Sequence, residues 1–263
     1  VECTGLPGHS PLGIEGEGEG ELLHVPRSII FHALPQRGAA IAVRVFERLG
    51  WADGTLSFFA YENQHNGDTE FVRQRVEAQT NGSAIGTGSV VVRGSASKSE
   101  LFSILEQTDY FFYPVTAHDG TIHKDTFANV VAEALAHGVI VVAPPVAALP
   151  DIYHDHVVFV APPDGQKPLE LTDRSPIPNV DSAYTSEATV RAYAEAIQRL
   201  EADPVAKEAH RARGTEWARR IFQWGAITSA FYRDVTVGVS NVCHGNLPRK
   251  PEARDWSFVA PPI

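Results

Sequence analysis

Methionine is absent from the 263-residue chain, and cysteine occurs only twice. Because no initiator methionine is present, we expect an excised domain or a processed fragment rather than an untouched translation product. Cys3 and Cys243 stand near opposite ends of the chain, so neither a disulfide framework nor a cysteine zinc site is predicted. One disulfide between these two cysteines stays open as an alternative.

Long apolar runs and an excess of basic residues are also missing. No stretch of about 18 apolar residues occurs, which excludes a transmembrane helix. Residues 1–10 have neither the basic nor the apolar region of a signal peptide, so a cytoplasmic location is the expectation. The chain has 22 Lys and Arg against 32 Asp and Glu, and this net charge of −10 argues against a general nucleic-acid binder.

The composition is otherwise that of a soluble globular protein, with 43% hydrophobic and 21% charged residues. Three regions differ in texture. Residues 1–26 are predicted to form an acidic, glycine-rich tail or linker, because they show no apolar periodicity. Residues 27–184 carry the pattern of a sheet domain, and residues 185–263 are predicted to form C-terminal helices and a tail that pack on it.

The central region alternates short apolar runs with amphipathic segments, which predicts a parallel α/β sheet of the Rossmann-like type with helices on both faces. Strands are predicted at 28–31, 56–61, 89–93, 110–114, 139–143 and 157–160. Helices are predicted at 41–49, 70–79, 97–105 and 126–137, followed by two C-terminal helices around 190–200 and 206–222.

The segment 124–138 offers the best candidate site. Asp125 precedes its helix and Glu133 follows eight residues later. At about 3.6 residues per turn this is just over two turns, so both carboxylates can face one side. The N–H groups of Thr126 and Phe127 are expected at the helix start, where an anion is favoured. The site would lie at the carboxyl edge of the sheet and would suit a phosphorylated sugar. The alternative is that Asp125 only caps the helix and that Glu133 is solvated.

This segment resembles the E-x7-E segment of retaining GT-B glycosyltransferases of group 1. Further similarities to that family follow in the same order along the chain, at Arg37-Gly38, Arg93-Gly94, Tyr113-Pro114, Leu149-Pro150-Asp151-Ile152 and Phe222-Gln223-Trp224. The resemblance covers about residues 28–232 and implies the donor-binding, C-terminal half of a GT-B enzyme. A sugar would then pass from a nucleoside-diphosphate sugar to an unknown glycan, lipid or protein acceptor, with retention of configuration.

The resemblance also implies roles for single residues. Glu133 would bond the nucleotide ribose, Asp125 the hydroxyls of the transferred sugar, and the main chain of Thr126 and Phe127 the sugar and phosphate. Arg37 would neutralise the diphosphate, and Arg93 would lie beside the base.

Three further points concern the diphosphate and the sugar loop. His32-Ala33 stands where the family often has Gly-Arg, so one diphosphate cation is missing, and Lys124 could replace it. His118 lies in the loop expected to face the sugar. A metal site is not predicted, because the histidines fit no compact zinc pattern and no D-x-D motif follows a strand.

No cofactor is expected beyond the donor substrate, and an N-terminal acceptor domain or partner chain is implied. The rival interpretation is a non-catalytic nucleotide-binding or docking module derived from a glycosyltransferase. The short Asp125, the missing Gly-Arg and the lack of an acceptor half favour it. A dinucleotide oxidoreductase is disfavoured, because Gly86-Thr87-Gly88 comes before a strand rather than after one.

Overall fold

The computed structural model describes residues 24–59, 67–80, 88–114, 117–118, 121–122, 127–161, 163 and 186–222. The chain divides into two compact units, Val1–Arg220 and Ile221–Ile263. Of the second unit only Ile221 and Phe222 are described. Residues 1–23 of the predicted tail 1–26, both cysteines, residues 164–185 and Trp224 lie outside the described residues, whereas Val25 and Pro26, predicted as tail, belong to the first strand.

Six parallel strands form the sheet, in the order β3-β2-β1-β4-β7-β8. Their bounds are β1 Val25–His32, β2 Thr55–Phe59, β3 Ser89–Val92, β4 Thr108–Phe112, β7 Ile140–Ala143 and β8 Val158–Phe159. The order reverses between β1 and β4, which pair with each other while β1 also pairs with β2. The predicted Rossmann-like α/β fold is therefore confirmed, and its topological switch point lies at the carboxyl ends of β1 and β4.

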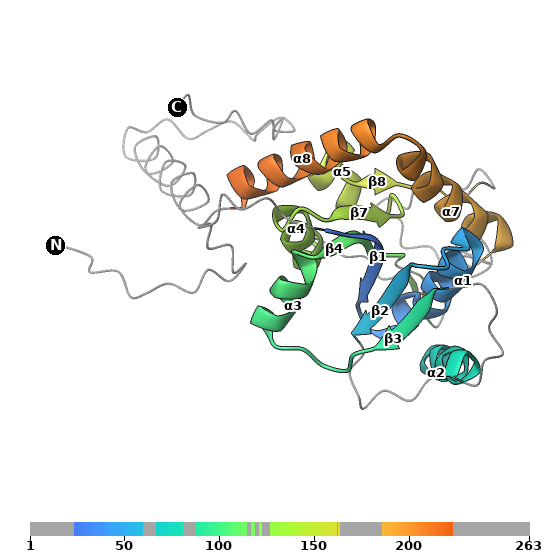
Figure 1. Ribbon diagram of the computed structural model, residues 1–263. Helices are drawn as coiled ribbons and strands as arrows, with labels where there is room; N and C mark the ends of the chain where they lie inside the picture. Colours follow the sequence, from blue (N-terminus) through green and yellow to red (C-terminus); the bar gives the residue numbers. More distant parts are fainter. Residues whose placement is uncertain are drawn as a thin grey trace, which may run out of the picture. The chain divides into compact units, whose positions relative to one another are not determined.

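Helices cover both faces of this sheet (Figure 1). Figure 1 shows α3 and α4 on one side and α1, α2 and α7 on the other. The helices in chain order are η1 Pro35–Arg37, α1 Ala39–Leu49, α2 Gly67–Thr80, α3 Lys98–Leu105, α4 Asn129–Ala136, α5 Leu149–Tyr153, η2 His154–His156, α7 Glu187–Ala202 and α8 Pro204–Ile221. Two short antiparallel strands, β5 Ala117–His118 and β6 Thr121–Ile122, stand where the sequence predicted a polar loop.

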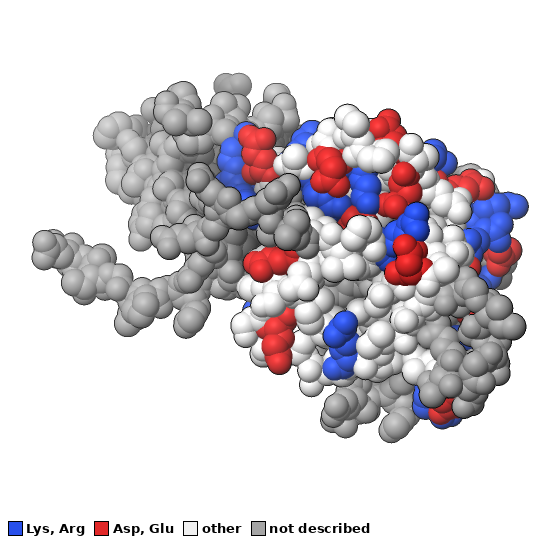
Figure 2. Space-filling view, viewed as in Figure 1, with Lys and Arg blue, Asp and Glu red and all other residues white. Residues whose placement is uncertain are grey.

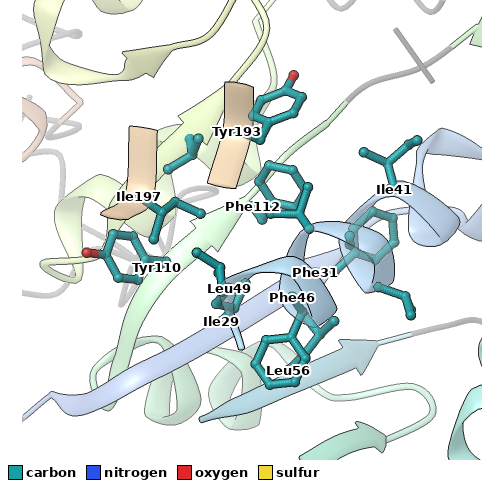
Figure 3. Packing of buried hydrophobic residues seen from close by; sticks show 14 of the residues in the cluster. Ile29, Phe31, Ile41, Phe46, Leu49, Leu56, Tyr110, Phe112, Tyr193 and Ile197 are labelled. Carbon is teal, nitrogen blue, oxygen red and sulfur yellow. The ribbon is translucent and has the colours of Figure 1, made fainter. Parts of the chain in front are cut away.

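The main core lies between the sheet and the layer formed by α1 and α7 (Figure 3). Successive strand residues point to opposite faces, so every second residue of each strand enters this core. These residues are Ile29, Phe31, Leu56, Phe58, Tyr110, Phe112, Ile140 and Val142. The residues between them, such as Ile30, Phe111 and Val141, are also buried, which is the pattern of a parallel sheet covered on both faces.

Charged side chains of both signs mix along α7 and α8 on the face seen in Figure 2, and no patch of one sign forms there. Buried polar contacts of Lys207 and Arg211 with Asp109 join α8 to the sheet. Within the described ranges, no helix combines the length and apolar character that crossing a bilayer requires.

Candidate functional site

Two loops meet at the switch point. Gly38 follows η1, which follows β1, while Pro114 follows β4. Gly38 has a φ of +118°, and a Cβ added there would lie 2.6 Å from the Pro114 carbonyl oxygen. Only glycine satisfies both the backbone angle and this close approach. The loop that carries Arg37 is thus packed directly against the end of β4.

Arg37 ends η1 and is partly exposed at the carboxyl edge of the sheet. The short helix η1 lies against β5, the first strand of the small hairpin after β4. This position suits the diphosphate cation predicted from the sequence, because ligands of open α/β sheets bind at this edge.

Glu133 lies in α4 and is only 2% exposed. Its Oε1 lies 2.5 Å from Nζ of Lys98, the first residue of α3. Burial raises the pKa of Glu133, and the ammonium of Lys98 acts in the opposite direction. The alternative that Glu133 is a solvated helix residue is therefore wrong, because it is a buried carboxylate that forms an ion pair with Lys98.

Sequence reasoning missed Lys98. The signal was available, because the predicted capping box fixes where α3 begins and hence puts Lys98 at its first position. In the structure Ser97 and Glu100 form both bonds of that box. A cation in the first turn faces the positive end of the helix dipole, which is unfavourable. An unfavourable charge at a helix start indicates that the residue has a role other than stabilising its own helix. For Lys98 this role is the ion pair with Glu133, which lies in a different helix.

His32, the last residue of β1, and Ala33 after it stand where the resembling family often has Gly-Arg, so Ala33 takes the place of the arginine. Burial lowers the pKa of His32, and the nearby positive charge of Lys98 lowers it further. Both effects favour the neutral imidazole in the ligand-free protein.

The segment before α4 differs from its prediction. The helix begins at Asn129, three residues later than Thr126, because Ala128 adopts a left-handed conformation with φ of 51°. The Tyr153 hydroxyl donates to the Phe127 carbonyl oxygen at 2.6 Å, and the Ala128 carbonyl oxygen lies 3.2 Å away. The first turn of α4 therefore offers the N–H groups of Asn129 and Val130 rather than those of Thr126 and Phe127.

The remaining predicted residues are placed as follows. Arg93 follows β3 and is exposed, with its Nε donating to Ser57 Oγ at 3.1 Å. His118 lies in β5, but its side chain is outside the described part. Lys124, Asp125 and Thr126 also lie outside the described residues, so the shared cleft of Asp125 and Glu133 stays a prediction.

Side chains of helix α8 form hydrogen bonds with the C-terminal end of α4. Arg211 Nη1 donates to the Gly138 carbonyl oxygen at 2.7 Å, and Arg219 Nε donates to the Ala136 carbonyl oxygen at 2.8 Å. These bonds satisfy carbonyl groups at the C-terminal end of α4, where cations are favoured. The position of Glu133 thus depends on side chains far along the sequence.

Arg211 is itself held by a buried carboxylate. Asp109 in β4 is 1% exposed and forms ion pairs with Arg211 and with Lys207, whose Nζ lies 2.7 Å away. Among the described residues, no group of three or more His, Cys, Asp and Glu side chains could hold a metal ion.

Residues 62–174 match a family model described as "Glycosyl transferases group 1". A comparison with curated proteins found no match.

Three solved structures are similar in fold. Sucrose-phosphate synthase from Thermosynechococcus elongatus is 20% identical, with a TM-score of 0.52 over 81% of this chain and 46% of that one. The α,α-trehalose-phosphate synthase (UDP-forming) from Burkholderia vietnamiensis is 13% identical, with a TM-score of 0.51 over 80% and 45%. A glycosyltransferase from Rickettsia africae is 11% identical, with a TM-score of 0.50 over 84% and 48%.

The chain spans less than half the length of each of these three structures. The family match covers the segment that holds Glu133, and the six-stranded parallel sheet is that of one GT-B half. The resemblance of this chain to the group 1 glycosyltransferases of the GT-B fold is thereby confirmed.

Proposed function

We propose that this chain is the donor-binding half of a retaining glycosyltransferase, which transfers a sugar from a nucleoside-diphosphate sugar to a glycan, lipid or protein acceptor. The family match supports sugar transfer as the general class of activity. The proposal rests above all on Glu133, a buried carboxylate on a helix that starts at the carboxyl edge of the sheet. A buried carboxylate that accepts hydroxyl groups is suited to a ribose.

The proposed contacts follow the switch point. Glu133 accepts the ribose hydroxyls, and Arg93 lies beside the base after β3. Arg37 neutralises the diphosphate together with the first turn of α4. Asp125 holds hydroxyls of the transferred sugar, and Lys124 and His118 lie in the loop that faces it.

In the proposed reaction the bond between the sugar C1 and the diphosphate oxygen breaks, and an acceptor oxygen bonds C1 on the same face. The nucleoside diphosphate leaves with the electron pair, and its freed phosphate oxygen takes up the proton of the acceptor hydroxyl. Arg37 and the α4 amides stabilise the charge that develops on it, which is the main contribution this half can make. Neither a metal ion nor a further cofactor is part of this proposal.

The acceptor is proposed to bind a second domain or partner chain. GT-B enzymes use two halves of this kind, and the three similar structures are more than twice as long as their matched parts. A non-catalytic nucleotide-binding module is the second candidate. The His32-Ala33 pair favours it, because the family often has Gly-Arg there and one cation of its diphosphate site is therefore lacking.

The test begins with calorimetric titration of uridine, adenosine and guanosine diphosphates, which identifies the base. The best ligand and its 2′-deoxy analogue are then titrated against the unmutated chain and Glu133→Gln. If Glu133 bonds the ribose, the penalty for the deoxy ligand shrinks in the variant. The coupling free energy should be about 0.5–3 kcal/mol, as for contacting groups. Strictly additive losses would remove Glu133 from the ribose site.

An assay of catalytic turnover distinguishes the glycosyltransferase from the non-catalytic nucleotide-binding module. Incubation of the chain with the matching nucleotide sugar and simple glycosides should release nucleoside diphosphate if the chain is catalytic. Binding without release, also after an acceptor half is supplied, would favour the module.

A further inference from the structure

The backbone of Lys98 is held in place at the start of α3, whereas its side chain is partly exposed to solvent. Ser97 N donates to Glu100 Oε2 at 2.8 Å, and Glu100 N donates back to Ser97 Oγ, so the start of α3 is tied down. The Lys98 side chain is nevertheless 52% exposed, and its Nζ lies 5.4 Å from the centre of the Phe102 ring. The ammonium group therefore stands at the boundary between solvent and the buried carboxylate.

The carboxylate of Glu133 has Lys98 as its one ion-pair and hydrogen-bond partner within the part of the chain that the structure describes. A ligand that reaches this carboxylate through hydroxyl groups must share or displace the ammonium. Displacement is physically easy for Lys98, because its stem is long and its charge is half in water. Displacement of a cation is costly only if no other anion receives it.

The residues around Lys98 link it to the switch point at the carboxyl ends of β1 and β4. Its positive charge acts on His32 at the end of β1, besides its direct contact with Glu133 on α4. The loop after β1 carries Arg37 and is packed on the end of β4 through Gly38. The ammonium of Lys98 is thus near the strand end at which the proposed diphosphate would lie, and where His32-Ala33 replaces the Gly-Arg of the resembling family.

We propose that Lys98 is a specificity-determining residue of the donor site, which exchanges Glu133 for a phosphate oxygen when a nucleotide binds. In the free protein Glu133 holds the Lys98 ammonium in place. When a nucleotide binds, hydrogen bonds from the ribose hydroxyls to the Glu133 carboxylate replace the bond from Lys98. Lys98 then supplies the second diphosphate cation beside Arg37. This inference rests on the proposed function, because it needs a ribose at Glu133.

The experiment compares Lys98→Met with Lys98→Arg, and uses Arg199→Met as the control. Arg199 is an exposed cation near the end of α7, a helix whose Glu201 pairs with Tyr110 and Lys207. Each variant and the unmutated chain are titrated with the preferred nucleoside diphosphate and with the nucleoside alone. Thermal melting without ligand checks that each variant is folded.

Lys98→Met should weaken diphosphate binding by roughly ten- to a hundredfold, the range of a charged hydrogen bond. Nucleoside binding should change by less than about threefold, because the carboxylate stays available to the ribose. Lys98→Arg should restore most of the diphosphate affinity, and Arg199→Met should leave both affinities unchanged. The dependence of diphosphate binding on salt should become weaker in Lys98→Met.

An equal change for both ligands, or no change for either, would overturn the role of Lys98 while nucleotide binding by the unmutated chain upheld the proposed function. If the unmutated chain bound none of the diphosphates, the proposed function and the role of Lys98 would both be rejected.

Discussion

Lys98 Nζ lies 2.5 Å from Glu133 Oε1 and so joins the first residue of α3 to the middle of α4. One partner is 52% exposed and the other only 3% by side chain. Such an unequal pair gives little stability, because the buried charge loses hydration that a half-solvated ammonium replaces only in part. An arrangement that does not stabilise the free protein is consistent with a carboxylate held for a ligand.

Glu133→Gln should therefore not destabilise the ligand-free chain near neutral pH and should raise its free energy of unfolding. The pKa of Glu133 is raised in the folded state above its ordinary value of 4.5. The folded state then disfavours the charged form, so the cost is fully present above the folded pKa and disappears as the pH falls to about 4.5. The advantage of the glutamine variant should shrink over the same range.

Urea unfolding of both proteins between pH 4 and pH 8 measures this difference. A loss of stability in Glu133→Gln that grows as the pH rises would show that the ion pair with Lys98 outweighs the burial of the carboxylate.

Arg37→Ala tests the loop that Gly38 packs against Pro114. If Arg37 bonds the diphosphate, the variant should bind a nucleoside diphosphate more weakly by roughly 1.5–3 kcal/mol, as for a charged hydrogen bond. The free nucleoside should bind almost as before. Parallel titrations of the two ligands give the answer, and equal losses for both would show that Arg37 acts on the fold.

The sheet and most helices could be predicted from the sequence because their signals are local. Buried runs such as Ser28–Phe31 and the capping box at Ser97 and Glu100 need no knowledge of distant residues. The start of helix α4 was harder to predict. Its apolar pattern extends to Thr126, but Tyr153 from α5 and the left-handed Ala128 delay its start to Asn129.

The environment of Glu133 could not be predicted, although its position could. Its eight-residue spacing from Asp125 indicates a helix face, but burial depends on what packs over that face. Lys98 precedes Glu133 by 35 residues, and Arg211 and Arg219 follow much later. Contacts between such distant residues are set by the tertiary fold and leave no periodic signal.

Asp109 and Glu208 both pair with Arg211 and form a matched test of how α8 is held. Asp109 is 2% exposed by side chain, whereas Glu208 is 62% exposed. Asp109→Ala should lower the free energy of unfolding by about 3–5 kcal/mol, because Arg211 and Lys207 lose a buried partner. Glu208→Ala should cost about 1 kcal/mol or less, since exposed pairs contribute little. Similar losses in the two variants would contradict this assignment.

Tyr153 lets the segment before α4 be tested apart from the helix itself. Its hydroxyl is the donor that holds the Phe127 carbonyl, and its ring is fully buried. Tyr153→Phe keeps the ring and removes the bond, which should cost about 1–3 kcal/mol of stability because a carbonyl is left without this donor. The segment 125–127, which carries the proposed sugar contacts, should then be held less well.

The variant should consequently lose affinity for the nucleotide sugar but not for the nucleoside diphosphate, because the contacts proposed for the diphosphate all lie outside segment 125–127. They come from Glu133, Arg37, Lys98 and the first turn of α4. Titration of both ligands measures this split, and we expect the ratio of their affinities to fall by roughly three- to tenfold. Tyr193→Phe is the control, since Tyr193 is also buried but lies in α7 against Phe112. An equal loss for both ligands, or the same split in Tyr193→Phe, would mean that the Tyr153 hydroxyl serves the fold as a whole and not the sugar-binding segment.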